Sequence, residues 1–195
     1  MLSADGIAFD AVTKTERVPI RVNIPGGFMV YNTLDVLGAA LALGISLKDS
    51  AAVLAKVPHV QGRVEVVPTP GKDYTILIDY AHTPDSMVNV LQTVKEFAKG
   101  RTVAVFGCGG DRDKTKRPRM GKAAADWSDF AVVTTDNPRT EEPAAIIRDI
   151  LPGFDGSDTP YEVVEDRVEA IHWAMDHAQK DDVIVLCGKG HETYQ

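Results

Sequence analysis

The sequence has few cysteines, no long apolar run and no excess of basic residues, and each lack excludes a class of protein. The 2 cysteines among 195 residues, Cys108 and Cys187, cannot make a disulfide scaffold or a four-thiolate zinc site, and we predict buried thiols. No apolar run reaches the roughly 18 residues of a membrane-spanning helix. The opening residues, MLSAD, lack the basic start and apolar stretch of a signal peptide. We expect a cytoplasmic globular protein without a membrane partner.

The charge balance is acidic. The chain carries 21 Lys and Arg against 28 Asp and Glu, a formal net charge of -7. A protein that binds nucleic acid through its general surface normally has a basic face, so no nucleic-acid partner is expected. Any anionic ligand must therefore meet local positive charge. The hydrophobic content of 44% allows one good-sized core or two small ones.

The first part of the chain predicts a hairpin followed by two helices. Residues 7–12 and 17–24 form short strand patterns separated by the polar turn TKTE. Apolar, alanine-rich stretches at 30–43 and 47–57 indicate helices, with the sequence GIS as the break between them. The segment 58–62 then indicates a boundary, so we predict domains at 1–61 and 62–195.

The second part alternates strands with helices. Apolar runs such as 75–78 and 183–186 are typical of a parallel sheet covered by helices on both faces. We therefore predict a Rossmann-like, doubly wound α/β fold with a mostly parallel sheet. The expected strands are 63–67, 75–80, 102–106, 130–134, 162–164 and 183–187, and the expected helices are 85–98, 120–127, 143–150 and 166–178.

Four chemically rich motifs follow predicted strands. Ligands of open parallel sheets bind outside the carboxyl ends of the strands, so these motifs are the candidate site. They are DYAHTPD at 79–85, GCGGDRDK at 107–114, DNPR at 136–139 and GKGHE at 188–192. Each motif alone also has a plain structural interpretation as a turn or a helix start.

The first motif contains a helix start. Thr83 can cap the free amides and Pro84 suits the first helical position. Asp79 and His82 are polar groups that a bare cap does not require. A histidine beside a helix start can contact a nucleotide or a phosphate.

The second motif combines glycines with cations. Its glycines let backbone amides approach an anion, and positive charge follows. The cations are Arg112, Lys114, Lys116, Arg117 and Arg119. The motif is not an intact P-loop, because Asp113 and Cys108 occupy the two required glycine positions. It also fails as a dinucleotide fingerprint, since Arg112 stands where the third small residue belongs.

The third and fourth motifs suit an amino acid. Arg139, beside the turn that Asn137 and Pro138 enforce, offers a planar fork of donors for a carboxylate. Glu192, after two glycines, can accept hydrogen bonds from an ammonium group. Together the four motifs predict a zwitterionic amino acid bound beside a nucleotide.

In order and spacing, these motifs resemble those of the Mur ligases that add diaminopimelate, over nearly the whole chain. The resemblance implies that residues 1–61 are the end of the central ATP-binding domain and that 62–195 are most of the carboxy-terminal domain. It implies a meso-diaminopimelate site formed by Arg112, Asp136, Asn137, Pro138, Arg139, Gly188 and Glu192. His82 and Arg63 are expected nearer the nucleotide; no catalytic residue and no metal ligand is assigned.

The implied reaction is one step of peptidoglycan synthesis. ATP phosphorylates the D-glutamyl carboxylate of UDP-MurNAc-L-Ala-D-Glu, and the diaminopimelate amine attacks the acyl phosphate. The family's P-loop, its UDP-sugar-binding domain and its carbamylated lysine, which helps hold Mg²⁺, are not found in this sequence. We therefore expect a fragment that is inactive alone, with ATP and Mg²⁺ bound mainly elsewhere.

Two residues depart from the family pattern. Met29 stands where asparagine is usual, and Thr115 replaces a common glycine. Two alternative functions stay open from the sequence. One is a related ligase that adds lysine or glutamate, and the other is a non-catalytic α/β module that binds a nucleotide or an amino acid. Arg139 favours diaminopimelate over lysine, because lysine has no second carboxylate.

Overall fold

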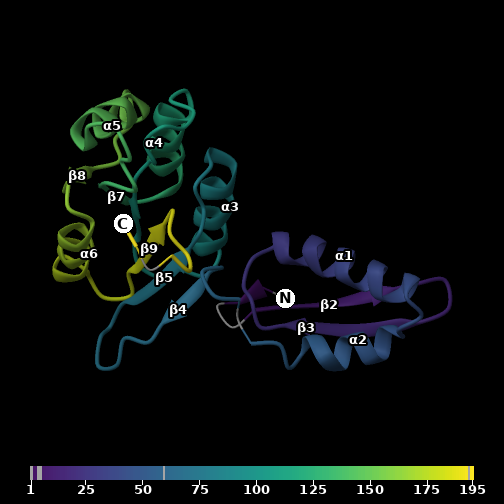
Figure 1. Cartoon of the computed structure of the whole chain (residues 1–195). Helices are drawn as coiled ribbons and strands as arrows, with labels where there is room; N and C mark the ends of the chain where they lie inside the picture. The colour runs from purple at the N-terminus through teal and green to yellow at the C-terminus, as the bar shows by residue number, and fades with distance from the viewer. Residues whose placement is uncertain (1, 4–5, 59, 193) are drawn as a thin grey trace. The chain divides into compact units, whose positions relative to one another are not determined.

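The chain divides into two compact units. The computed structural model describes residues 2–3, 6–58, 60–192 and 194–195 (Figure 1). The units are Met1–Val60 and Gln61–Gln195. That the first unit is the end of an ATP-binding central domain stays a prediction.

The first unit is a small antiparallel sheet with two helices. Its elements are β1 (Leu2–Ser3), β2 (Gly6–Val12), β3 (Arg17–Val22), α1 (Phe28–Ala42) and α2 (Leu47–Leu54). The predicted hairpin is confirmed: β2 pairs with β3, and the Thr13 hydroxyl oxygen accepts from the Glu16 amide at 3.1 Å. Buried Ile7, Ile20 and Leu37 form part of the core.

Two elements of this unit end two or three residues before their predicted ends, and α1 covers residues 28–42 in place of the predicted 30–43. The second strand ends at Val22, and the Asn23 side chain donates to the carbonyls of Ala55 and Val57 at 3.2 and 3.3 Å. The second helix accordingly ends at Leu54, three residues before the predicted end. An asparagine that bonds backbone carbonyls ends the strand in a way that the apolar pattern does not reveal.

The second unit is a six-stranded sheet covered by helices, in the order β4-β5-β9-β6-β7-β8. Strands β5, β9, β6, β7 and β8 run parallel, and β4 is antiparallel to β5. Helix α6 packs on one face of the sheet, and Figure 1 shows α3 and α4 on the other. The predicted doubly wound fold is confirmed. The strands are β4 (Glu65–Val67), β5 (Thr75–Asp79), β6 (Thr102–Phe106), β7 (Phe130–Val133), β8 (Tyr161–Val163) and β9 (Val183–Cys187); the helices are α3 (Pro84–Lys95), α4 (Lys116–Trp127), α5 (Pro143–Ile150), α6 (Arg167–Asp176) and the 3₁₀ turn η1 (Leu151–Phe154).

The sequence predicts the central strands best. Every residue of β6 and β9 is buried, so both strands read as continuous apolar runs, and both were predicted with the observed bounds. Strand β4 starts two residues later than predicted, because Val64 has a left-handed φ of 45° that a strand does not allow. Helix α4 starts at Lys116, four residues before the predicted start.

Both cysteines are buried, as predicted. Burial raises the pKa of Cys108 and of Cys187 to about 12, so both stay protonated thiols at neutral pH. Across the part of the chain that the structure describes, no helix combines the length and the apolar character that crossing a membrane requires.

Candidate amino-acid-binding site

A cavity of about 550 Å³ lies at the carboxyl ends of the parallel strands, within the second unit. Its walls come from the segments that follow β5, β6, β7 and β9, as expected for an open parallel sheet. A cavity of this size suits a small molecule. It is lined by Tyr80, His82, Thr83, Gly109, Arg112, Asp113, Lys116, Asp136, Asn137, Arg139, Gly188, Glu192 and Tyr194.

The structure brings seven of the nine predicted site residues together around this cavity. They are His82, Arg112, Asp136, Asn137, Arg139, Gly188 and Glu192. Pro138 is not part of this lining and instead borders an adjoining hollow with Tyr194. Arg63 also lies outside the lining, with its guanidinium carbon 5.1 Å from the centre of the Tyr80 ring.

The helix start predicted in the motif at 79–85 is confirmed, and His82 lies directly before it. Thr83 caps α3, with the reciprocal bond of a capping box to Ser86. The Nδ1 atom of His82 lies 3.0 Å from the carbonyl oxygen of Tyr80. The centres of the His82 and Tyr80 rings are 4.6 Å apart. His82 is exposed and lines the wall of the cavity.

The loops after β6 and β7 pack backbone against backbone. The amide of Gly110 donates to the carbonyl of Asn137 at 2.9 Å, and a Cβ on Gly110 would overlap the carbonyl of Pro138. A Cβ on Gly107 would also lie too close to the carbonyl oxygen of Thr134. These two glycines therefore serve loop packing, and the Gly110 amide is not free for an anion, contrary to the sequence interpretation.

Arg139 is held by this packing. Its Nη1 atom donates to the carbonyls of Gly110 and Asn137 at 2.8 and 3.3 Å. Among the described residues, Nη2 and Nε have no hydrogen-bond partner, so part of the donor fork is available to a ligand carboxylate.

Two of the five predicted cations reach the cavity. Arg112 is exposed, and within the described part of the chain its side chain donates one hydrogen bond, to the carbonyl of Asp111 at 3.3 Å. Lys116 donates to the carbonyl of His82 at 3.0 Å. Arg117 was expected to supply charge to an anion, and that is wrong: it is 1% exposed and ion-paired with Glu141. Because α4 begins at Lys116, Arg117 belongs to its first turn, and its side chain points into the protein interior.

The opposite charge comes from Asp136 and Glu192. Asp136 accepts from the Asn137 amide at 2.6 Å and lies 3.4 Å from the ammonium of Lys189. Burial on its own raises the pKa of Glu192, but the bond from the Gly190 amide and nearby positive charges hold it below its usual value. An ionised Glu192 can accept hydrogen bonds from a ligand ammonium. Gly188, with φ of 98°, keeps a side chain away from this side of the cavity.

Other residues of the site were not predicted. Tyr80, Asp113 and Tyr194 line the cavity. The position of Tyr80 directly after β5 was a usable signal, whereas Tyr194 lies in a segment without a periodic pattern. Arg167 is buried behind the β9 end, where its Nη2 donates to the carbonyl of Cys187 at 2.8 Å. Its place at a helix start gave no hint of burial.

The described residues contain no cluster of candidate metal ligands. Within residues 2–3, 6–58, 60–192 and 194–195, no three His, Cys, Asp or Glu side chains are grouped to hold a metal ion.

A family model described as the glutamate ligase domain of Mur ligases matches residues 62–190. The chain belongs to the Mur ligase family. It is 50% identical over 191 residues to the UDP-N-acetylmuramoyl-L-alanyl-D-glutamate–2,6-diaminopimelate ligase of Clostridium botulinum, covering 97% of this chain and 39% of that protein. The ligase of the same name from Clostridioides difficile is 48% identical over 192 residues, covering 98% of this chain and 40% of that protein.

A solved structure agrees with the family assignment. It is also a UDP-N-acetylmuramoyl-L-alanyl-D-glutamate–2,6-diaminopimelate ligase, with 38% identity and a TM-score of 0.67. The match covers 100% of this chain and 39% of that one. This chain thus spans about 39 to 40% of the length of these three relatives. The predicted family resemblance is confirmed.

Proposed function

We propose that this chain forms the amino-acid-binding part of a cytoplasmic, ATP-dependent ligase that adds meso-diaminopimelate to UDP-MurNAc-L-Ala-D-Glu. The observation that carries the proposal is the charge pattern of one cavity, in which Arg112 and Arg139 share the walls with Asp136 and Glu192. The relatives described above, at 48 to 50% identity, are named as ligases of UDP-N-acetylmuramoyl-L-alanyl-D-glutamate and 2,6-diaminopimelate.

The charge pattern suits the far end of diaminopimelate. Each end of this molecule carries one carboxylate and one ammonium group. We assign the far carboxylate to Arg139 and Arg112, and the far ammonium to Asp136 and Glu192 with Gly188 beside them. Lysine has the ammonium but not the carboxylate, so it would leave Nη2 and Nε of Arg139 without a carboxylate partner. Asn137 completes the wall, and Pro138 shapes the turn that presents it.

The proposed reaction joins an acyl group to an amine. The γ-phosphate of ATP is transferred to the D-glutamyl carboxylate, giving an acyl phosphate and ADP. The near amine of diaminopimelate then attacks the acyl carbon, the amide bond forms, phosphate leaves and the amine loses a proton. Residues of this chain act by holding that amine in position.

The binding of ATP phosphates and Mg²⁺ is assigned to parts of the relatives that this chain does not match. The sequence contains no intact P-loop, and no three His, Cys, Asp or Glu side chains of the described residues are grouped to hold a metal ion. His82 is proposed for the nucleotide side of the cavity because it lines the wall against Tyr80. Arg63 lies on the Tyr80 ring and is proposed for the same side.

A chimera tests the proposal. The matching region of the Clostridium botulinum ligase is replaced by this chain, and product formation is measured with meso-diaminopimelate or lysine as the amino acid. We expect product with diaminopimelate and at least about 10-fold lower kcat/KM with lysine. An active chimera without this preference would contradict the assignment of the site.

A further inference from the structure

A cluster of charged side chains joins helix α4 to the loops that carry the two arginines of the cavity. Its centre is Arg117, a buried residue in the first turn of α4. The guanidinium makes two parallel bonds to Glu141, at 2.7 and 3.0 Å, and a third to Asp149 at 2.8 Å. None of these three residues lines the cavity.

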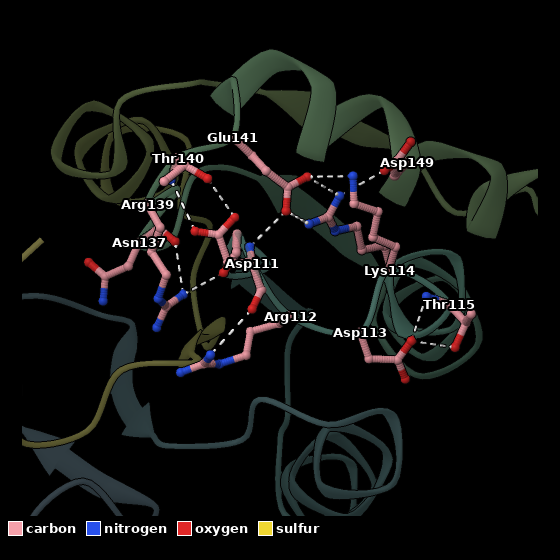
Figure 2. Close-up of polar contacts among 12 residues, drawn as sticks. Asp111, Arg112, Asp113, Lys114, Thr115, Asn137, Arg139, Thr140, Glu141 and Asp149 are labelled. Atoms are coloured by element: carbon pink, nitrogen blue, oxygen red, sulfur yellow. Dashed lines mark hydrogen bonds and ion pairs between the residues drawn. The ribbon is translucent and has the colours of Figure 1, made fainter.

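The two carboxylates that bind Arg117, those of Glu141 and Asp149, differ in their other hydrogen-bond partners. Glu141 also accepts the backbone amide of Asp111 at 2.7 Å, so it joins α4 to the loop after β6 (Figure 2). Among the described residues, Asp149 on α5 contacts Arg117 and makes no hydrogen bond or ion pair with that loop. One carboxylate therefore reaches a binding loop and the other does not.

A second set of bonds closes the connection. The Asp111 carboxylate accepts from the hydroxyl and the amide of Thr140, at 2.7 and 3.2 Å. Figure 2 shows Asp111 between Thr140 and Glu141, which come from the other loop. Asp111 precedes Arg112 and Thr140 follows Arg139, so each cross-link is one residue from a cavity arginine.

The backbone at these places needs such support. Asp111 and Arg139 have φ of 53° and 54°, the left-handed region that non-glycine residues rarely adopt. Strained conformations persist where the surrounding contacts over-determine them. Bonds from Arg117, Lys114 and the Asp111 amide lower the pKa of Glu141 to about 2, so it is ionised at neutral pH.

We propose that Glu141 and Arg117 are positioning residues, which clamp the loop after β6 to the loop after β7 and thereby set Arg112 and Arg139 for one ligand. The inference rests on the proposed function for the identity of that ligand. The clamp itself is a property of the chain without a ligand, so the two can be tested separately.

The first test compares Glu141→Gln with Asp149→Asn in the 195-residue chain. Each variant removes one negative charge that faces the Arg117 guanidinium. Only Glu141→Gln also weakens a bond to the binding loop, from the Asp111 amide. Amide hydrogen exchange is measured at Gly110 and Asp111, with thermal unfolding to compare stability. We expect exchange at least about 10-fold faster in Glu141→Gln, and little change in Asp149→Asn. Equal exchange in the two variants would overturn the clamp.

A surface variant tests the clamp if Glu141→Gln does not fold. Thr140→Val removes the hydroxyl bond to Asp111 from an exposed position outside the cavity lining. The same two amides are expected to exchange faster, and unchanged exchange would count against the clamp.

The second test is kinetic and uses the chimera. Glu141→Gln should raise the KM for meso-diaminopimelate about 10-fold and change the KM for ATP by less than about twofold, since small misplacements of binding groups weaken substrate use strongly. Asp149→Asn should change neither. Equal effects on both substrates would reduce Glu141 to a purely structural residue. If the parent chimera does not use diaminopimelate, the proposed function fails, whereas the exchange experiment still decides on the clamp.

Discussion

The Nη1 atom of Arg139 lies 2.8 Å from the carbonyl oxygen of Gly110, so the loop after β6 holds this guanidinium in place. The side chain that we assign to ligand recognition is therefore oriented by a loop 29 residues earlier in the chain. A pre-oriented donor loses less freedom when it binds, which favours affinity and discrimination.

Arg139→Ala in the chimera should remove most of the preference for diaminopimelate over lysine. A charge-assisted hydrogen bond contributes about 1.5 to 3 kcal/mol, or roughly 10- to 150-fold in the ratio of the two kcat/KM values. The loss should come from weaker use of diaminopimelate, because removing a partner does not build a lysine site. Steady-state kinetics with both amino acids measures it, and Arg139→Lys keeps the charge as a control. A retained preference in the alanine variant would make Arg139 a turn residue only.

Arg112→Ala should raise the KM for diaminopimelate much more than the KM for ATP. The side chain is exposed, and its one hydrogen bond among the described residues is to the adjacent carbonyl of Asp111, so stability should change by less than about 0.5 kcal/mol. Initial-rate kinetics with each substrate varied in turn separates the two effects. Equal increases would assign this loop to the nucleotide.

Gly110→Ala should destabilise the second unit, because the added Cβ overlaps the carbonyl of Pro138. Overpacking a tight contact costs about 1 to 3 kcal/mol in the free energy of unfolding. Gly38→Ala is the control, since a Cβ there meets nothing within 4 Å and Gly38 lies inside α1. That control should stabilise slightly, as alanine favours a helix. Chemical denaturation measures both, and no loss in Gly110→Ala would disprove the close packing of the loops.

The stability of the chain should depend on Glu141 in acid. Its pKa of about 2 in the folded chain lies below the ordinary value of 4.5, so the folded state favours the ionised carboxylate. The resulting stabilisation is fully present above pH 4.5 and is lost as the pH falls toward 2. The difference in free energy of unfolding between the parent chain and Glu141→Gln should therefore shrink over this range. A difference that does not change with pH would show that the carboxylate is not selectively stabilised.

Neither thiol should react in the folded chain. Cys108 and Cys187 are buried, and burial raises the pKa of each to about 12, which leaves almost no thiolate at neutral pH. A thiol reagent such as a disulfide dye should label the chain slowly under native conditions and label both cysteines in denaturant. Rapid labelling of the native chain would contradict their burial.

The sequence alone predicts those features that local patterns encode. Strands β6 and β9 are buried on both faces, so their apolar runs show their bounds directly. The cap at Thr83 is readable because a helix start needs specific residues at fixed offsets. The motif at 136–139 points to the site because the carboxyl ends of parallel strands meet at one edge. The family itself is also recognisable from the order of the motifs.

Tertiary structure decided how those motifs meet. Arg117 reads as one more cation in a basic stretch, and only its pairing with Glu141, 24 residues later, makes it a buried residue. Gly110 reads as a ligand-facing glycine until Pro138 is packed against it. Such contacts join loops that are distant in the sequence, and their geometry depends on strand order and on where each helix begins. No local pattern carries that information, because the two segments of each contact form their own turns and helices independently and meet only when the sheet is assembled.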